Sequence, residues 1–159
     1  MKQLQDAYIV AATRTPIGRS HKGAFKHLRP DDLLAHALRS AMAQVPNLDP
    51  KAVEDIICGC AIPEGQQGLN VARVGAVLAG LPHSVGGITV NRFCASGLSA
   101  VAMAADRIRV GEADVMIAAG TESMSMVPMM GNSPSLSPTI FRSTEDIESY
   151  GIAYGMGLT

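Results

Sequence analysis

The sequence has almost no net charge and no run of lysine and arginine residues. Its 159 residues include 13 basic and 14 acidic side chains, which gives a formal net charge of -1 at pH 7. A surface without an excess of one sign gives no electrostatic attraction for nucleic acid or for an anionic membrane. We therefore expect small molecules or other proteins as partners, no nucleic acid and no membrane.

Cysteine is also scarce, with only Cys58, Cys60 and Cys94 in the chain. An odd number of cysteines, with no apolar signal-peptide core after the first residues, is typical of a reducing compartment. We expect the protein to be cytoplasmic.

Long apolar runs are missing as well. The longest nearly uncharged stretch, residues 88–105, is interrupted by polar residues such as Asn91 and Arg92, so it does not predict a membrane-spanning helix. The composition is 47% hydrophobic and 17% charged, which is typical of a globular domain with its own core.

Apolar runs and helical patterns alternate along the first 120 residues. Short apolar runs predict strands at residues 7–12, 53–60, 86–91 and 114–119. Helical spacing of apolar side chains predicts helices at about residues 31–45, 70–79 and 96–110. This alternation predicts an α/β fold with a mostly parallel sheet and helices on both faces. The first strand is expected to be buried on both faces, and the last helix to lie inside the protein.

The composition changes after Gly120, where Ser, Pro, Met and Gly become frequent and no long period can be counted. We expect residues 1–120 to form the core domain. Residues 121–159 are expected to begin an excursion from that domain which is not finished at residue 159, because so much irregular chain is unusual at the end of a compact domain. The sequence is therefore expected to be a fragment.

Cys94 is the candidate nucleophile. It stands where the strand predicted at residues 86–91 turns directly into the Ala-rich helix predicted at residues 96–110. Free N–H groups and the helix dipole at that terminus stabilise a thiolate over a thiol. A similar strand-to-helix turn presents the nucleophilic serine of hydrolases. The alternative is that Cys94 is a small apolar core residue, as unpaired cysteines often are.

Cys58 and Cys60 form no metal site by themselves. Structural zinc needs about four ligands, and the sequence has no second pair of cysteines. Since side chains alternate along a strand, both thiols are expected on one face of a core strand. We predict no metal ion.

Four ordered segments resemble motifs of the thiolase family, whose members join or split 3-oxoacyl-coenzyme A. Residues 90–101, VNRFCASGLSAV, resemble the family's acyl-enzyme signature. The other matches are TRTPIG at residues 13–18, NVAR at 70–73 with AGLP at 79–82, and GTESMS at 120–125. The matches extend over nearly the whole chain, which is identified on this basis as the N-terminal portion of a member of the family.

The resemblance implies a layered thiolase-like fold and an acyl-cysteine intermediate on Cys94. It implies that residues 121–159 are the beginning of the loop domain, which covers the substrate. It also implies that coenzyme A thioesters are substrates rather than cofactors, that Met156 lines the substrate site, and that the protein is a homodimer or homotetramer. Family members carry a catalytic histidine and a second cysteine in a second half, which these 159 residues do not include. The fragment alone is expected to be inactive.

Three other functions stay open beside a thiolase of fatty-acid β-oxidation. One is a biosynthetic thiolase that forms acetoacetyl-coenzyme A, although the family members specialised for that product tend to carry a histidine where Gly155 stands. The second is a ketoacyl carrier-protein synthase, which residues 91–93 and 122–125 argue against. The third is a non-catalytic, thiolase-like lipid-binding module.

Overall fold

The computed structural model describes residues 4–135, which form three strands, three α-helices and two short 3₁₀ helices. In chain order these elements are α1 (Pro30–Ala43), η1 (Pro50–Ala52), β1 (Asp55–Gly59), η2 (Gly65–Gln67), α2 (Val71–Ala79), β2 (Ile88–Val90), α3 (Ser96–Arg109) and β3 (Met116–Gly120).

The strands form one parallel sheet in the order β2-β1-β3. In the register of the sheet, Ile57 of β1 lies between Ile88 of β2 and Ala118 of β3. Residues 56–59 of the central strand β1 are buried, as expected for a parallel strand with helices on both faces. The predicted α/β fold with a parallel sheet is confirmed.

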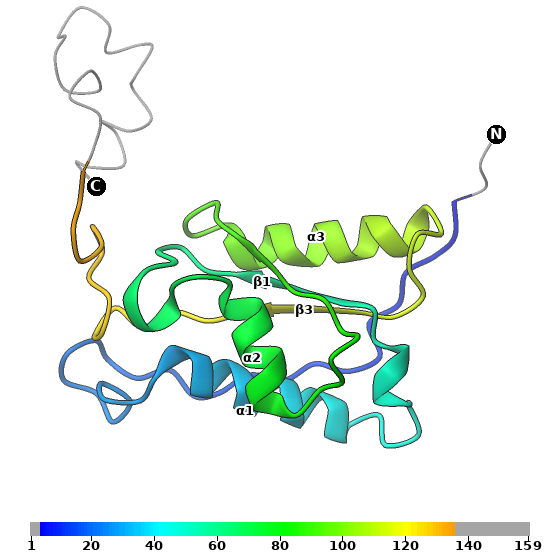
Figure 1. Ribbon diagram of the computed structural model, residues 1–159, viewed down its shortest axis with the longest axis horizontal. Helices are drawn as coiled ribbons and strands as arrows, with labels where there is room; N and C mark the ends of the chain where they lie inside the picture. The colour runs from blue at the N-terminus through cyan, green and yellow to red at the C-terminus, as the bar shows by residue number, and fades with distance from the viewer. Residues whose placement is uncertain (1–3, 136–159) are drawn as a thin grey trace, which may run out of the picture.

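Helices cover both faces of the sheet (Figure 1). Leu34 and Leu38 of α1 and Val71 of α2 pack with Ile56 in the larger core on one face. Ala100 and Ala104 of α3 pack with Ile57 in a smaller core on the other face. Successive residues of β1 point to opposite faces, so Ile56 and Ile57 belong to different cores.

The bounds of α2 agree with the helix predicted at about residues 70–79. The side chain of Asn70 accepts a hydrogen bond from the backbone N–H of Arg73, which is a typical N-cap. Gly80 ends the helix in the left-handed conformation, with φ of 80°, and a residue without Cβ adopts this geometry with little strain. These local signals fix both ends of α2.

The prediction of a strand at residues 7–12 is wrong within the described part of the chain. This segment has no ladder partner in the sheet, and Tyr8, Ile9 and Val10 are 76%, 81% and 75% exposed. An apolar run predicts a buried strand, but a strand also needs a neighbouring backbone edge at about 4.8 Å. Among residues 4–135, no strand supplies that edge to the segment.

The prediction that α3 lies inside the protein is also wrong for the described residues. Leu98 is 75% exposed and Val101 is 43% exposed, whereas Ala100 and Ala104 are buried. The small alanine side chains let α3 approach the sheet closely, so the larger apolar residues are left at the sides and the outside of the helix.

Candidate active site

Cys94 lies in the turn between β2, which ends at Val90, and α3, which begins at Ser96. Its thiol is free and exposed. The turn is at the carboxyl end of β2, and ligands of open α/β sheets bind outside the carboxyl ends of the strands. Cys94 is therefore neither in the core nor in the middle of a helix, and a substrate can reach it.

Side-chain hydrogen bonds hold the turn in place. The Oδ1 atom of Asn91 accepts a hydrogen bond of 2.8 Å from the N–H of Phe93. The hydroxyl of Ser96 accepts one of 2.8 Å from the N–H of Arg92 and donates one of 2.6 Å to the carbonyl of Phe93. The backbone on the N-terminal side of Cys94 is thus fixed by two polar side chains, one from each side of the thiol.

Phe93, directly before the candidate nucleophile, has the left-handed backbone conformation with φ of 46°. This conformation is uncommon for a residue with a large side chain, and its strain is of order 1–3 kcal/mol. The hydrogen bonds of Asn91 and Ser96 to Phe93 offset that strain. A strained residue next to an exposed nucleophile is typical of the sharp strand-to-helix turns that present a nucleophile at a sheet edge.

The first turn of α3 packs directly on the end of β1 at Gly59. A Cβ atom added to Gly59 would lie 2.5 Å from the carbonyl carbon of Ser96 and 2.6 Å from the nitrogen of Gly97. Both contacts are to backbone, which a rotamer change cannot relieve. Gly59 therefore sets the distance between the sheet and the turn that carries Cys94.

At the N-terminal end of α3, the N–H of Cys94 is available as a hydrogen-bond donor beside the thiol. The N–H groups of Ala95 and Ser96 donate to the carbonyls of Arg92 and Phe93, each at 3.0 Å. Within residues 4–135, no carbonyl accepts a hydrogen bond from the N–H of Cys94. The positive end of the α3 dipole lies at the same place and also favours negative charge there. The turn can therefore donate a hydrogen bond to negative charge that develops on an oxygen bound next to Cys94.

A polar network connects the chain that follows β1 with the chain that follows β3. Glu122 accepts a hydrogen bond of 2.6 Å from the N–H of Ala61, and another from the side-chain amide of Gln67. Gln67 is fully buried; it also donates to the carbonyl of Ile62 at 2.8 Å and accepts from the N–H of Ser123 at 2.9 Å. The network fixes two loops at the carboxyl end of the sheet, which is also the end at which Cys94 lies.

We expect Gln67→Leu to lower the free energy of unfolding of the chain by about 2–4 kcal/mol, because groups of half-buried Glu122 and of buried Ile62 and Ser123 would lose a hydrogen-bond partner. Urea unfolding followed by circular dichroism measures the change. The matched control is Gln66→Leu on the same 3₁₀ helix, where the side chain is only half-buried; we expect a change below about 1 kcal/mol. Equal losses in the two variants would show that the network does not stabilise the loops.

Cys58 and Cys60 lie in the larger core, as predicted from their spacing. Burial raises the pKa of the Cys58 thiol to about 12 and that of the Cys60 thiol to about 11, from an ordinary value of 9.0. The charge of Glu122 further raises the pKa of Cys60. Both thiols are therefore protonated and unreactive near pH 7, in contrast to the accessible position of Cys94.

Met156, the predicted substrate-lining residue, lies outside the described residues.

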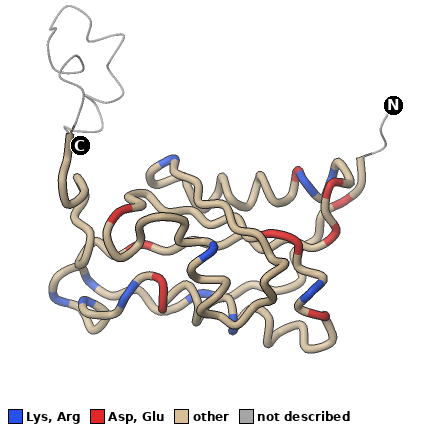
Figure 2. Tube along the Cα trace, viewed as in Figure 1, with Lys and Arg blue, Asp and Glu red and all other residues tan. Residues whose placement is uncertain are grey.

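Within residues 4–135, no group of three or more His, Cys, Asp or Glu side chains is placed to bind a metal ion. In the same range, no helix is both long enough and apolar enough to cross a membrane. Basic and acidic residues are interspersed along the chain in Figure 2.

The sequence analysis predicts Cys94 as the nucleophile but does not predict the roles of Gln67 and Gly59, which fix the loops and the helix next to it. Gln67 has no motif and no periodic pattern around it, and its partner Glu122 is 55 residues away in the sequence. Gly59 does carry a signal in the sequence, because a glycine inside a strand often marks the close approach of another backbone.

Known proteins resemble the chain over most of its length. The family model described as "Thiolase, N-terminal domain" matches residues 7–153. The 3-ketoacyl-CoA thiolase of Bacillus subtilis is 47% identical over 129 residues, which are 81% of this chain and 33% of that protein. The 3-oxoadipyl-CoA/3-oxo-5,6-dehydrosuberyl-CoA thiolase of Escherichia coli is also 47% identical, over 83% of this chain and 33% of its own.

A solved structure is also similar to the chain. The crystal structure of the Bacillus anthracis acetyl-CoA acetyltransferase superposes with a TM-score of 0.74 and is 32% identical in sequence. The match covers 86% of this chain and 36% of that one. The chain thus spans about a third of the length of the relatives that it matches.

Proposed function

Because the chain belongs to the thiolase family, we propose that it supplies the nucleophilic cysteine, Cys94, of an acyltransferase that uses coenzyme A thioesters. The reaction interconverts an acyl-CoA and acetyl-CoA with free coenzyme A and a 3-oxoacyl-CoA. The observation that supports this most strongly is the exposed thiol of Cys94, held in a strained turn directly before α3.

In the first step the Cys94 sulfur attacks the carbonyl carbon of the substrate. An S–C bond forms, and the carbonyl electron pair moves to the oxygen, which accepts a hydrogen bond from the N–H of Cys94. When the carbonyl re-forms on an acyl-CoA thioester, the bond to the coenzyme A sulfur breaks, and that sulfur takes up a proton as it leaves. On a 3-oxoacyl-CoA the attacked carbon is the 3-oxo carbon instead, and the bond between C2 and C3 breaks. Acetyl-CoA then leaves as a carbanion, which takes up a proton from the second cysteine that the family resemblance places outside these 159 residues. Transfer between two sulfurs is nearly isoenergetic, so the acyl-cysteine keeps its activation for the second step.

In the second step the acyl group leaves Cys94 in one of two ways. The thiolate of a coenzyme A molecule attacks it in thiolysis, or the carbanion of acetyl-CoA attacks it in condensation. Both attacks release the Cys94 thiolate. This two-step scheme requires ping-pong kinetics.

The family resemblance assigns the remaining catalytic groups, a histidine and a second cysteine, to a part of a thiolase outside these 159 residues. Residues 1–159 alone therefore do not complete the reaction. We assign residues 1–120 to the core domain and residues 121–159 to the start of the domain that covers the substrate, where Met156 contacts the acyl or pantetheine part of the ligand.

The cellular role that fits best is thiolysis in fatty-acid β-oxidation, in the cytoplasm. Three free thiols suit a reducing compartment. The role rests on similarity to relatives such as the 3-ketoacyl-CoA thiolase of Bacillus subtilis. A biosynthetic thiolase that forms acetoacetyl-CoA is the alternative.

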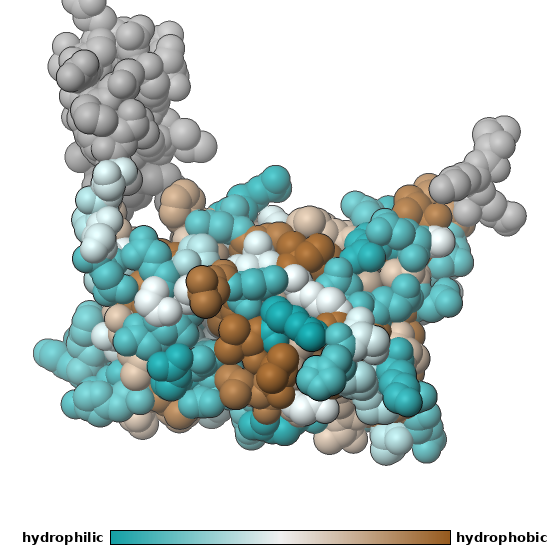
Figure 3. Space-filling model, in the orientation of Figure 1, coloured by the Kyte–Doolittle hydropathy of each residue, from teal (hydrophilic) through white to brown (hydrophobic). Residues whose placement is uncertain are grey.

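We propose a homodimer or homotetramer in which β2 pairs with its copy in a second subunit. β2 lies at an edge of the three-stranded sheet, and an exposed edge strand needs a partner or a cover. The neighbouring helix α2 leaves Val77 and Leu78 51% and 44% exposed, and apolar side chains gather over this helix in Figure 3. Both features favour contact of this face with a second copy of the chain rather than with solvent.

A hybrid enzyme tests the function. Residues 1–159 would be joined to the two thirds of the Bacillus subtilis 3-ketoacyl-CoA thiolase that this chain does not match. We expect acetyl transfer from acetyl-CoA at least about a hundredfold faster than from acetylated acyl carrier protein, because the proposed site recognises coenzyme A. Faster transfer from the carrier protein would favour the synthase, and a folded hybrid that transfers from neither would favour the lipid-binding module.

A further inference from the structure

The segment NVAR at residues 70–73, which resembles a family motif, is not part of the turn that carries Cys94. It forms the N-cap and the first turn of α2, and this turn packs on the chain that enters β2. A Cβ atom added to Gly87 would lie 2.7 Å from the nitrogen of Arg73 and 2.9 Å from its Cα atom. Backbone therefore meets backbone between the start of α2 and the residue just before β2.

The side-chain amide of Asn70 connects this first turn of α2 with β2. Its Oδ1 atom accepts the N-cap hydrogen bond from the N–H of Arg73 at 3.3 Å, and a second one of 2.8 Å from the hydroxyl of Thr89. Its Nδ2 atom donates to the carbonyl of Gly87 at 2.7 Å. The hydroxyl of Thr89 also accepts from the N–H of Ala72 at 3.2 Å. One side chain thus caps a helix and binds an edge strand.

Arg73, the last residue of the segment, holds the connection between α2 and β2. Its guanidinium donates to the carbonyl of buried Val85, and to the carbonyl of His83 at 3.2 Å. A cation in the first turn of a helix is disfavoured by the helix dipole. The bonds to the two carbonyls offset that cost. Together with Gly87, they fix the chain before β2 at three points.

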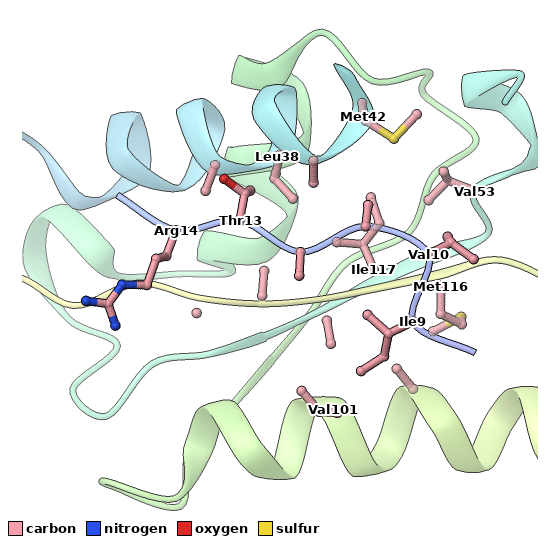
Figure 4. Close-up of a pocket in the computed structure, with 18 of the residues that line it drawn as sticks. Ile9, Val10, Thr13, Arg14, Leu38, Met42, Val53, Val101, Met116 and Ile117 are labelled. Carbon is pink, nitrogen blue, oxygen red and sulfur yellow. The ribbon is translucent and has the colours of Figure 1, made fainter. Parts of the chain in front are cut away.

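The strand β2 depends on such contacts because it is short and lies at an edge of the sheet. Within residues 4–135 it has three residues and one ladder partner, β1. A groove of about 720 Å³ lies at the opposite edge, between β3 and residues 7–15, with Leu38 and Met42 of α1 on one side and Val101 of α3 on the other (Figure 4). The strands β1 and β3 separate that groove from β2.

A shift of β2 would be transmitted to Cys94. The turn at residues 91–96 begins directly after β2, which ends at Val90. Hydrogen bonds of Asn91 and Ser96 hold this turn together from within. Because the turn is bonded within itself, it moves with the strand that precedes it.

We propose that Asn70 is a positioning residue for the reaction of Cys94, because it fixes β2 against α2 and so sets where the thiol and the N–H of Cys94 stand. The inference rests on the acyl transfer proposed for Cys94. A misplacement of reacting groups by about 1 Å can lower a rate about a hundredfold. Asparagine suits this role because one amide offers an oxygen that accepts from two donors and an N–H that donates to a carbonyl.

The variant Asn70→Asp separates positioning from helix capping. Aspartate caps a helix about as well as asparagine, so the urea midpoint of the chain should move by less than about 0.5 M. An ionised aspartate has no N–H for the carbonyl of Gly87 and places a charged oxygen there instead. In the hybrid enzyme, kcat for acyl transfer should fall at least about tenfold while KM changes less than about threefold, because bound substrate would meet a displaced thiol. An unchanged kcat would overturn the proposal.

Hydrogen exchange provides a readout that does not need catalysis. The N–H of Gly86 donates to the carbonyl of Glu54, and alternate residues of a strand face the same neighbour, so the amides of Ile88 and Val90 face β1. In the chain of residues 1–159, Asn70→Asp should speed exchange of these two amides at least about tenfold, because β2 loses an anchor.

The control for this exchange experiment is β3, whose amides at Ile117 and Ala119 should change less than about threefold. Faster exchange confined to α2 would mean that Asn70 only caps the helix, and the proposal would be wrong. If the unsubstituted hybrid transfers no acyl group, the proposed function fails, and the exchange result alone decides whether Asn70 holds β2.

The hydroxyl of Thr89 offers a second set of variants. Thr89→Val removes the hydroxyl at nearly constant shape, so kcat of the hybrid should fall at least about fivefold, and Thr89→Ser should restore it to within about twofold. The matched control is Ser84→Ala, which removes an exposed hydroxyl from the connection before β2 and should leave kcat within about twofold. Equal kcat values for Thr89→Val and Ser84→Ala would contradict the proposal. If Thr89→Val does not fold by circular dichroism, the exchange result for Asn70→Asp decides.

Discussion

Replacing Cys94 with serine should lower the acyl-transfer rate of the hybrid enzyme at least about a thousandfold, because the covalent intermediate cannot form efficiently without the thiolate. A serine hydroxyl is almost entirely protonated near pH 7 and is a far weaker nucleophile than a thiolate. The rate is measured as release of acetyl-CoA from a 3-oxoacyl-CoA in the presence of free coenzyme A. Loss of less than about tenfold would reject Cys94 as the nucleophile.

The same variant should leave the fold intact, since the Cys94 side chain is exposed. We expect its free energy of unfolding to change by less than about 0.5 kcal/mol, as is usual for exposed positions. Cys60→Ser provides the opposite pattern, because a hydroxyl would be placed in the core around β1. That variant should destabilise the protein by about 1–3 kcal/mol. Any activity lost by Cys60→Ser should track its unfolding.

The second large effect is expected at Gly59. Gly59→Ala places a Cβ atom 2.5 Å from the backbone of Ser96, so the first turn of α3 has to move away from the sheet. Overpacking of this kind costs about 1–3 kcal/mol, and backbone contacts put this site at the upper end. The shifted turn should also displace Cys94 and reduce acyl transfer by the hybrid about a hundredfold or more, since small misplacements of reacting groups are costly.

Gly97→Ala is the matched control for Gly59→Ala. A Cβ atom added to Gly97 meets nothing within 4 Å in the described part of the chain, and Gly97 lies in the first turn of α3. Exchanging glycine for alanine inside a helix stabilises it by about 0.5–1 kcal/mol. Urea unfolding should therefore move in opposite directions in the two variants. If Gly59→Ala were as stable as Gly97→Ala, the close contact between β1 and α3 would not exist.

The sequence predicts the elements whose determinants are local. Asn70 and Gly80 mark the ends of α2, and the short apolar runs at residues 53–60, 86–91 and 114–119 mark all three strands of the described sheet. The position of Cys94 in a strand-to-helix turn follows from the order of apolar strand, polar turn and Ala-rich helix. These features depend on residues within a few positions of one another.

The features that the sequence does not predict depend on distant partners. Residues 7–12 have the composition of a buried strand, but composition does not say which backbone edge would pair with them. The exposed side of α3 escapes prediction for a related reason, because its alanine side chains, not its leucine and valine, face the sheet. The contact of Gly59 with Ser96 and the pairing of Gln67 with Glu122 join residues more than thirty positions apart.

The most direct measurement of the central claim is the mass of the protein after reaction with an acyl donor. The hybrid enzyme is incubated with acetyl-CoA, quenched in acid and digested, and the peptides are analysed by mass spectrometry. We predict one acetyl group, on the peptide that contains Cys94, and none on the peptide that contains Cys58 and Cys60, whose pKa values burial raises to about 12 and about 11. An active hybrid whose acetyl group is found on any other residue, or on none, would contradict the account.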